Sequence, residues 1–253
     1  MLPYAVLSFL AVVLTGCLST PDAAPTPSRG ASKAGAAGLP VVWWSTSELG
    51  ITRLAGIDAE LAKPFEGNLV VTDKAKEKGL ILDCASARTL QTQGYKAQYP
   101  RDIAVLGVLT AKCLALEALK TAQPARTNYM PVSPYDGRVI DMLPAALAPA
   151  VSPAQQAAID AAGRGGQPIR MVESTVAFVA ARGDDEILLG GEGWQETLVL
   201  LGRGDFDGDS KLDWLVRTDL AVQRGTHRVS RLFLLTRDSP EMVMRVIREL
   251  KPE

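Results

Sequence analysis

Histidine, cysteine and aromatic side chains are all scarce in this chain of 253 residues. His227 is the single histidine, which excludes catalytic triads that depend on histidine and zinc sites built from several histidines. Lys and Arg number 27 against 28 Asp and Glu, for a formal net charge of −1, and no basic stripe of the kind that binds nucleic acid is present. We therefore expect no nucleic-acid partner.

Familiar catalytic motifs are also missing. The chain contains neither a Gly-x-Ser-x-Gly sequence nor a phosphate-binding glycine-rich loop. Its N-terminal apolar run, residues 2–14, is shorter than the roughly 20 residues that a transmembrane helix needs. That run carries no charged side chain and stands where the apolar core of a signal peptide belongs.

The sequence Leu14-Thr15-Gly16-Cys17 directly follows this run. It resembles a bacterial lipobox, in which signal peptidase cuts before the cysteine and acyl chains such as palmitate are attached to it. The resemblance implies that residues 1–16 are a removed signal peptide and that Cys17 anchors the protein to a membrane of the cell envelope. The alternative is an ordinary cleaved signal, or an uncleaved anchor in which Cys17 is an incidental thiol.

Leu18 stands where Gram-negative lipoproteins that stay in the inner membrane usually have Asp. The lipobox resemblance therefore implies the outer membrane, on its periplasmic face or at the surface, if the cell is Gram-negative. Residues 17–40 are rich in Ser, Thr, Pro, Ala and Gly and bury too little apolar surface to fold, so we expect a lipid-anchored flexible tether.

The two remaining cysteines, Cys84 and Cys113, form an even pair in a chain expected to be exported. Such a pair predicts a disulfide in an oxidising compartment. The alternative is two buried free thiols. Because no Cys-x-x-Cys motif is present, we expect no redox role for either cysteine.

Residues 41–150 have a helix-weighted pattern. The strongest helix spans 101–122, between Pro100 and Pro124, and would join by the disulfide to a preceding strand at 80–83. Shorter patterns predict a helix over 57–63 and strands over 41–44 and 69–72. The side chains expected on the buried face of the long helix are Ile103, Leu106, Leu109, Cys113 and Leu116.

Residues 151–253 change to a β pattern after one short helix. Ser152 and Gln155 form a capping box with Pro153 at the first helical position, and Gly163 predicts the stop. Apolar or β-branched runs then alternate with glycine-rich turns, which indicates an antiparallel meander over 171–181, 186–189, 196–201, 212–217 and 229–236. Residues 241–250 fit both a strand and a helix. We expect an α+β fold in which the helix-weighted N-terminal part packs with this C-terminal β-meander.

An acidic loop interrupts the meander. Asp205, Asp207, Asp209 and Asp213 fall at loop positions 1, 3, 5 and 9, a spacing that gathers carboxylates around one hard cation. The backbone carbonyl of Lys211, at position 7, is available as a further ligand. These carboxylates repel one another without a cation, so the spacing predicts calcium. The alternative is a solvated acidic turn.

The loop resembles the calcium loops of FG-GAP repeats and dockerins, more closely those of FG-GAP repeats because strands flank it on both sides. The resemblance implies that Asp205, Asp207, Asp209 and Asp213 are side-chain ligands. Ser210 stands where such loops usually have Gly, so a left-handed backbone there would be strained. Val216 replaces the bidentate Glu of an EF-hand. A propeller needs several copies of such a repeat, and this chain has one. We therefore do not expect the propeller fold or the adhesive function of FG-GAP proteins here.

Together these features predict a membrane-anchored envelope lipoprotein that acts as a binding or structural module, with a structural calcium ion. Its partner would be an envelope protein or a cell-wall component. In layout the chain also resembles uncharacterised bacterial lipoproteins that have one Asp-rich loop in their C-terminal third. The alternative is an envelope hydrolase with carboxylate acid–base chemistry. A pocket lined by two or more acids outside the loop would favour the hydrolase, and a flat apolar patch would favour the binding module.

Overall fold

The structure is a computed structural model. It describes residues 29–31, 38–44, 49–67, 69–131, 137–150, 152–183, 185–223, 225 and 228–252. The expected signal peptide, Cys17 and His227 lie outside the described residues. Within the described residues no helix combines the length and the hydropathy needed to cross a membrane.

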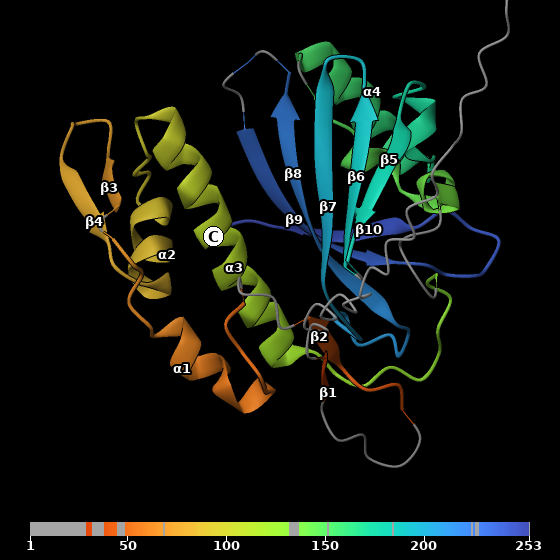
Figure 1. The fold of residues 1–253 in the computed structure, drawn as a ribbon, viewed down its shortest axis with the longest axis horizontal. Helices are drawn as coiled ribbons and strands as arrows, with labels where there is room; N and C mark the ends of the chain where they lie inside the picture. The colour runs from red at the N-terminus through yellow and green to blue at the C-terminus, as the bar shows by residue number, and fades with distance from the viewer. Residues whose placement is uncertain are drawn as a thin grey trace, which may run out of the picture.

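An antiparallel sheet forms the larger part of the molecule (Figure 1). Six of its strands follow one another in sequence and pair with their neighbours, as expected for a meander. Two short N-terminal strands extend the sheet, because Val42 and Trp43 of β2 pair with Arg203 and Gly202 of β7. The strands are β1 (Arg29–Ala31), β2 (Val42–Trp44), β5 (Ala177–Arg182), β6 (Glu186–Gly191), β7 (Trp194–Gly204), β8 (Asp213–Val222), β9 (Arg228–Thr236) and β10 (Arg245–Leu250).

The central strands are buried on both faces. Successive side chains of a strand point to opposite faces, and in β7 Leu198 and Leu200 join one hydrophobic core while Val199 and Leu201 join another. In β8 the same alternation separates Trp214 from its neighbour Leu215. Near-continuous apolar runs in these strands thus reflect a sheet covered on both sides.

Helix α3 (Pro100–Thr121) covers one face of the sheet. Its C-terminal half contributes Ala115, Leu116, Ala118 and Leu119 to the core that also holds Leu201 and Leu215. In Figure 1 α3 stands between the sheet and a small N-terminal group. This N-terminal group, a term used below in this sense, consists of α1 (Ile57–Leu61), β3 (Leu69–Thr72), β4 (Lys78–Ile81) and α2 (Cys84–Thr92).

The opposite face of the sheet is covered by α4 (Pro153–Arg164) and by short 3-10 helices. Ser152 caps α4 by accepting a hydrogen bond from the Gln155 N–H at 3.2 Å, as the capping pattern predicts. Ile159 of α4 packs into the core with Trp214 and Leu198. The 3-10 helices are Leu54–Gly56, which lies near α1, and Gly137–Met142, Ala145–Leu147 and Ile169–Met171.

The α+β fold class is confirmed, while several local expectations are not. The C-terminal segment is a strand, β10, and the strand expected from residue 171 begins at Ala177 after a 3-10 helix. Ile103 was expected on the buried face of α3, but the residue is 48% exposed because it lines an open groove between α3 and β9. Residues 29–31, within the expected tether, pair with β2.

Candidate functional site

The acidic loop joins β7 to β8 and is held by a segment distant in sequence. After α3 ends, the chain runs beside the loop, and the backbones of Gln123 and Asp205 exchange two hydrogen bonds of 2.9 and 2.8 Å. The Leu212 N–H donates to the Thr127 carbonyl at 2.7 Å. Residues 123–127, which the sequence pattern did not single out, therefore fix the loop to the end of α3.

Three of the four predicted carboxylates converge. One carboxylate oxygen from each of Asp205, Asp207 and Asp209 lies within 4.8 Å of the other two. Asp205 is buried, with 5% of its surface exposed, whereas Asp207 and Asp209 are exposed. Asp205 accepts hydrogen bonds from the N–H groups of Gly208 (2.7 Å) and Ser210 (2.9 Å), one on each oxygen. The loop backbone thus orients the carboxylate at its centre.

These bonds leave capacity for a cation. A carboxylate oxygen has two lone pairs, so an oxygen that accepts one N–H can also bind a metal ion. Hard oxygen ligands of this kind suit calcium. Asp207 and Asp209 each accept one further N–H, from Asp209 (3.2 Å) and Lys211 (2.8 Å). The donor set and its local shape therefore fit calcium.

Asp213, the fourth predicted ligand, does not join the converging oxygens. It is fully buried, and its Oδ2 accepts from the Phe206 N–H at 3.0 Å. Its Oδ1 makes no hydrogen bond of normal geometry. Burial raises the pKa of Asp213 to about 7; the Thr236 hydroxyl and the Phe206 N–H act in the opposite direction. Asp213 therefore stabilises the loop by accepting the hydrogen bond from the Phe206 backbone.

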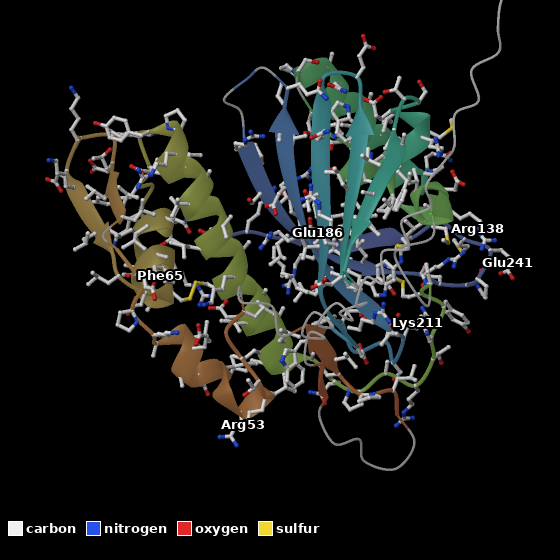
Figure 2. The ribbon with its side chains drawn as sticks, viewed as in Figure 1. Arg53, Phe65, Arg138, Glu186, Lys211 and Glu241 are labelled. Atoms are coloured by element: carbon white, nitrogen blue, oxygen red, sulfur yellow. A yellow bond between two sulfur atoms is a disulfide. The ribbon has the colours of Figure 1, made fainter. Side chains whose placement is uncertain are left out.

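Lys211 contributes its side chain at the site, beyond the backbone role that its position predicts. Its Nζ lies 3.0 Å from Asp209 Oδ2 and 2.7 Å from Asp238 Oδ1. The bonds to Asp238 and Asp209 raise the pKa of Lys211. In Figure 2 the labelled Lys211 lies toward the end of the sheet at which β1 and β2 are attached. A protein cation thus neutralises part of the loop's negative charge.

Asp238 and Arg245 are site residues that the loop pattern missed. Arg245 Nε donates to Asp238 Oδ2 at 2.8 Å, and together with Lys211 it lowers the pKa of Asp238 to about 2. Burial raises the pKa of Asp209, but its bonds to Lys211 outweigh burial and hold the pKa below the ordinary value. Among the described residues, Lys211 and Arg245 thus offset part of the negative charge of the loop and of Asp238.

Ser210 adopts the left-handed backbone that the glycine position demands, with φ of +67°. Its carbonyl accepts from the N–H groups of Arg126 (2.8 Å) and Thr127 (3.1 Å), in addition to the bond from its own N–H to Asp205. These bonds hold a conformation that a side chain disfavours. The same segment that braces the loop also maintains its strained residue.

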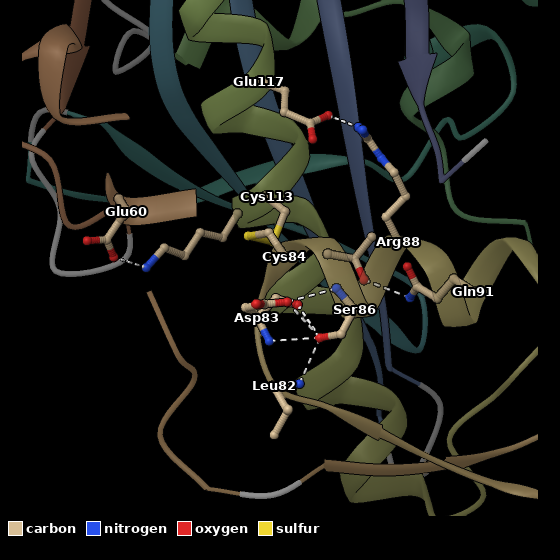
Figure 3. Close-up of a disulfide and its surroundings, with 11 residues drawn as sticks. Glu60, Leu82, Asp83, Cys84, Ser86, Arg88, Gln91, Cys113 and Glu117 are labelled. Atoms are coloured by element: carbon tan, nitrogen blue, oxygen red, sulfur yellow. Dashed lines mark hydrogen bonds and ion pairs between the residues drawn. A yellow bond between two sulfur atoms is a disulfide. The ribbon is translucent and has the colours of Figure 1, made fainter. Parts of the chain in front are cut away.

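A disulfide joins Cys84 to Cys113 (Figure 3). The sequence predicts a strand over 80–83 directly before Cys84, whereas Cys84 is the first residue of α2, so the bond joins two helices. Asp83 caps α2 by accepting from the Ser86 N–H at 2.8 Å, and the Ser86 hydroxyl accepts from the Asp83 N–H at 2.9 Å. Asp is a favoured N-cap residue, so Asp83 was the signal in the sequence that favours a helix start here.

No protein-family model matches this chain, and no curated protein and no solved structure matches it either.

Proposed function

We propose that this chain is a lipid-anchored protein of a bacterial cell envelope, and that its folded part is a binding or structural module with one calcium ion in the Asp-rich loop. The observation that carries the calcium proposal is the convergence of Asp205, Asp207 and Asp209 on one small region of the loop. The lipid anchor rests on the lipobox resemblance of Leu14 to Cys17.

The ion would act structurally. Calcium supplies positive charge that offsets the repulsion among the loop carboxylates. The loop backbone is bonded to residues 123–127, so stiffening the loop also stiffens the junction between α3 and the sheet. The described contacts of the loop are with its own backbone, with residues 123–127 and with Lys211, which favours a structural role for the ion.

An exposed apolar surface supports the binding-module part of the proposal. Val70 of β3 and Leu80 of β4 are register partners, so they lie on the same face of their hairpin, and both are exposed. Leu82, directly after β4, is exposed as well. Apolar side chains gathered on one exposed face are typical of surfaces that contact another macromolecule.

An envelope hydrolase is the second candidate, and one observation favours it. A pocket of about 500 Å³ outside the loop is lined by Asp160, Glu196 and Glu249. We rank this candidate lower because Glu249 is held in ion pairs with Arg231 and Lys251, and because only 3% of Glu196 is exposed. Neither acid is free to act on a substrate without rearrangement.

Calorimetric titration of calcium into the full-length protein in detergent tests the calcium proposal. We expect stoichiometric binding with a Kd on the order of 10⁻⁴ to 10⁻³ M, as in extracellular calcium modules. At about ten times Kd, calcium stabilises the fold by about 1.4 kcal/mol. The double variant Asp205→Ala, Asp207→Ala should lose the heat and the rise in melting temperature.

The matched control is Asp58→Ala, Asp141→Ala, which removes two exposed aspartates that are not among the converging carboxylates. It should bind calcium like the wild type. Absence of heat at millimolar calcium, or equal heats in the two double variants, would refute the calcium site. The anchor is tested separately: Cys17→Ser should move the protein from the membrane fraction to the soluble fraction.

A further inference from the structure

A second acidic site lies on the face of the sheet opposite α3. The pocket noted above, of about 500 Å³, is lined by α4, the segment before it, and strands β7 to β10. Its volume lies within the range of small-molecule sites. Glu196 comes from β7 and is the register partner of Leu220 on β8, so the acid stands among apolar neighbours.

Glu196 is buried without a partner for one of its oxygens. Only 3% of the residue is exposed, and its Oε2 makes no hydrogen bond within the described residues. The nearby Thr218 hydroxyl lowers the pKa somewhat, but it forms no hydrogen bond of normal geometry either. A buried carboxyl group in this state costs free energy unless a partner is supplied.

The cations around the pocket are already engaged. Arg231 donates two hydrogen bonds to Glu249, of 3.0 and 3.2 Å, and a third to the Ala146 carbonyl. Lys251 Nζ lies 3.0 Å from Glu249 Oε2. Across the pocket, Asp160 accepts from the Gln156 side chain at 2.7 Å. Three acids therefore share two cations, and both cations are bound to Glu249.

The remaining charged neighbour of Glu196 lies on the other face of the sheet. Asp219 of β8 raises the pKa of Glu196, but it is itself bonded to Arg217 at 2.8 Å and to Ser230 at 2.6 Å. No described cation is therefore left to pair with Glu196. Burial is the main cause that raises its pKa, to about 7, and the charge of Arg231 offsets this only in part.

We propose that the Glu196 side chain turns toward this pocket and binds a small molecule that carries a protonated amine on an aliphatic chain, with the ammonium donating to Glu196 Oε2. The ammonium supplies the missing cation and the missing hydrogen bond together. Ile159, Leu220 and Val246 line the pocket beside the acid and provide apolar surface for the aliphatic part. The inference concerns a site separate from the calcium loop and does not depend on calcium.

Binding has a characteristic pH dependence. In the empty pocket Glu196 holds its proton up to about pH 7, whereas pairing with an ammonium requires the carboxylate. The ligand therefore releases a proton on binding, and its apparent affinity falls about tenfold between pH 8 and pH 6. The other charged groups that line the pocket are Asp160, Glu249, Arg231 and Lys251, and the two cations among them are paired with Glu249.

Methyl NMR on the full-length protein in detergent tests the proposal. The probes are n-butylammonium, n-butanol and n-butyrate, which share an alkyl chain and differ in charge. Methyl resonances of Ile159, Leu220 and Val246 report on the pocket, and Val71, in the core of the N-terminal group, is the internal reference. We expect saturable shifts with n-butylammonium, at least tenfold weaker shifts with the other two, and the pH dependence given above.

Glu196→Gln should abolish the preference for n-butylammonium, because the amide accepts a hydrogen bond without supplying negative charge. Glu192→Gln, at an exposed turn between β6 and β7, removes the same charge outside the pocket and should bind like the wild type. Equal shifts with n-butanol, unchanged binding in Glu196→Gln, or no pocket shifts with any probe would each overturn the proposal. Every one of these outcomes is readable whether or not the loop binds calcium.

Discussion

The N-terminal group and the sheet are stabilised by different means. Within the N-terminal group, α2, β3 and β4 share a small core with α3 and add a disulfide to it, whereas Ile57 of α1 packs into the core between α3 and the sheet. The buried members of the small core are Leu69, Val71, Ile81, Ala87, Ala97 and Leu106. Ion pairs connect it further to α3: Lys112 with Glu60, Lys120 with Asp58, and Arg88 with Glu117. The sheet is instead enclosed between two larger apolar cores.

The comparison shows where buried acids are tolerated. The sheet contains Glu196 and Asp213 with little or no exposure, and burial raises the pKa of each to about 7. Apolar burial stabilises at roughly 25 cal/mol per Å², so a large core can offset a cost of a few kcal/mol for an unpaired acid. The N-terminal group has no such reserve and depends on a covalent bond.

The largest expected effect follows from removing that bond. Cys84→Ala with Cys113→Ala should destabilise the N-terminal group by roughly 3 to 4 kcal/mol, the loop-entropy value for a bridge across this separation. Alanine is chosen because both cysteines are buried and a serine hydroxyl would need a partner. Amide hydrogen exchange should accelerate in α2, β3 and β4 and stay slow in β7 and β8.

Equal acceleration in both regions would contradict the comparison, because it would mean that they unfold as one cooperative unit. Reduction of the wild type is an independent control that alters no residue. It should reproduce the exchange pattern of the double variant.

The second largest effect is a stabilisation, and it concerns the sheet. The pKa of Glu196 rises from about 4.5 unfolded to about 7 folded, so stability is lost as pH rises through this window and stays lost above it. Glu196→Gln should therefore stabilise the protein at pH 8 by up to about 3 kcal/mol. Near pH 4, where Glu196 is protonated in both states, the two proteins should differ little.

Denaturant midpoints of the wild type and Glu196→Gln, measured at both pH values, provide the test. Glu192→Gln serves as the reference and should show no pH-dependent difference. A stabilisation by Glu196→Gln of the same size at pH 4 and pH 8 would show that proton linkage is not its cause.

How far the sequence predicts each region depends on how local the deciding contacts are. The long helix at 101–122 and the acidic triad were predictable, because periodicity, flanking prolines and Asp spacing all act within a short stretch of chain. The acidic pocket was not, because Gln195, Glu196 and Thr197 are successive polar residues and only pairing with β6 and β8 decides which of them points inward. The prediction that Asp213 is a ligand was not met for the same reason. Its burial depends on contacts that are distant in sequence, such as that with Thr236.

The smallest effect compares one backbone feature in both regions. Lys76, in the turn between β3 and β4, and Ser210, in the acidic loop, share a φ of +67°. Glycine relieves the left-handed strain but adds freedom to the unfolded chain, so Lys76→Gly and Ser210→Gly should each stabilise the protein by about 0.5 kcal/mol.

The two variants should differ in their effect on calcium binding. The Ser210 N–H bonds to Asp205 at 2.9 Å, so relaxing this residue should shift the calcium affinity measurably, whereas Lys76→Gly should leave it unchanged. Calorimetry measures the calcium Kd of both variants. An equal Kd in the two would show that the strain at Ser210 does not affect the affinity of the loop for calcium.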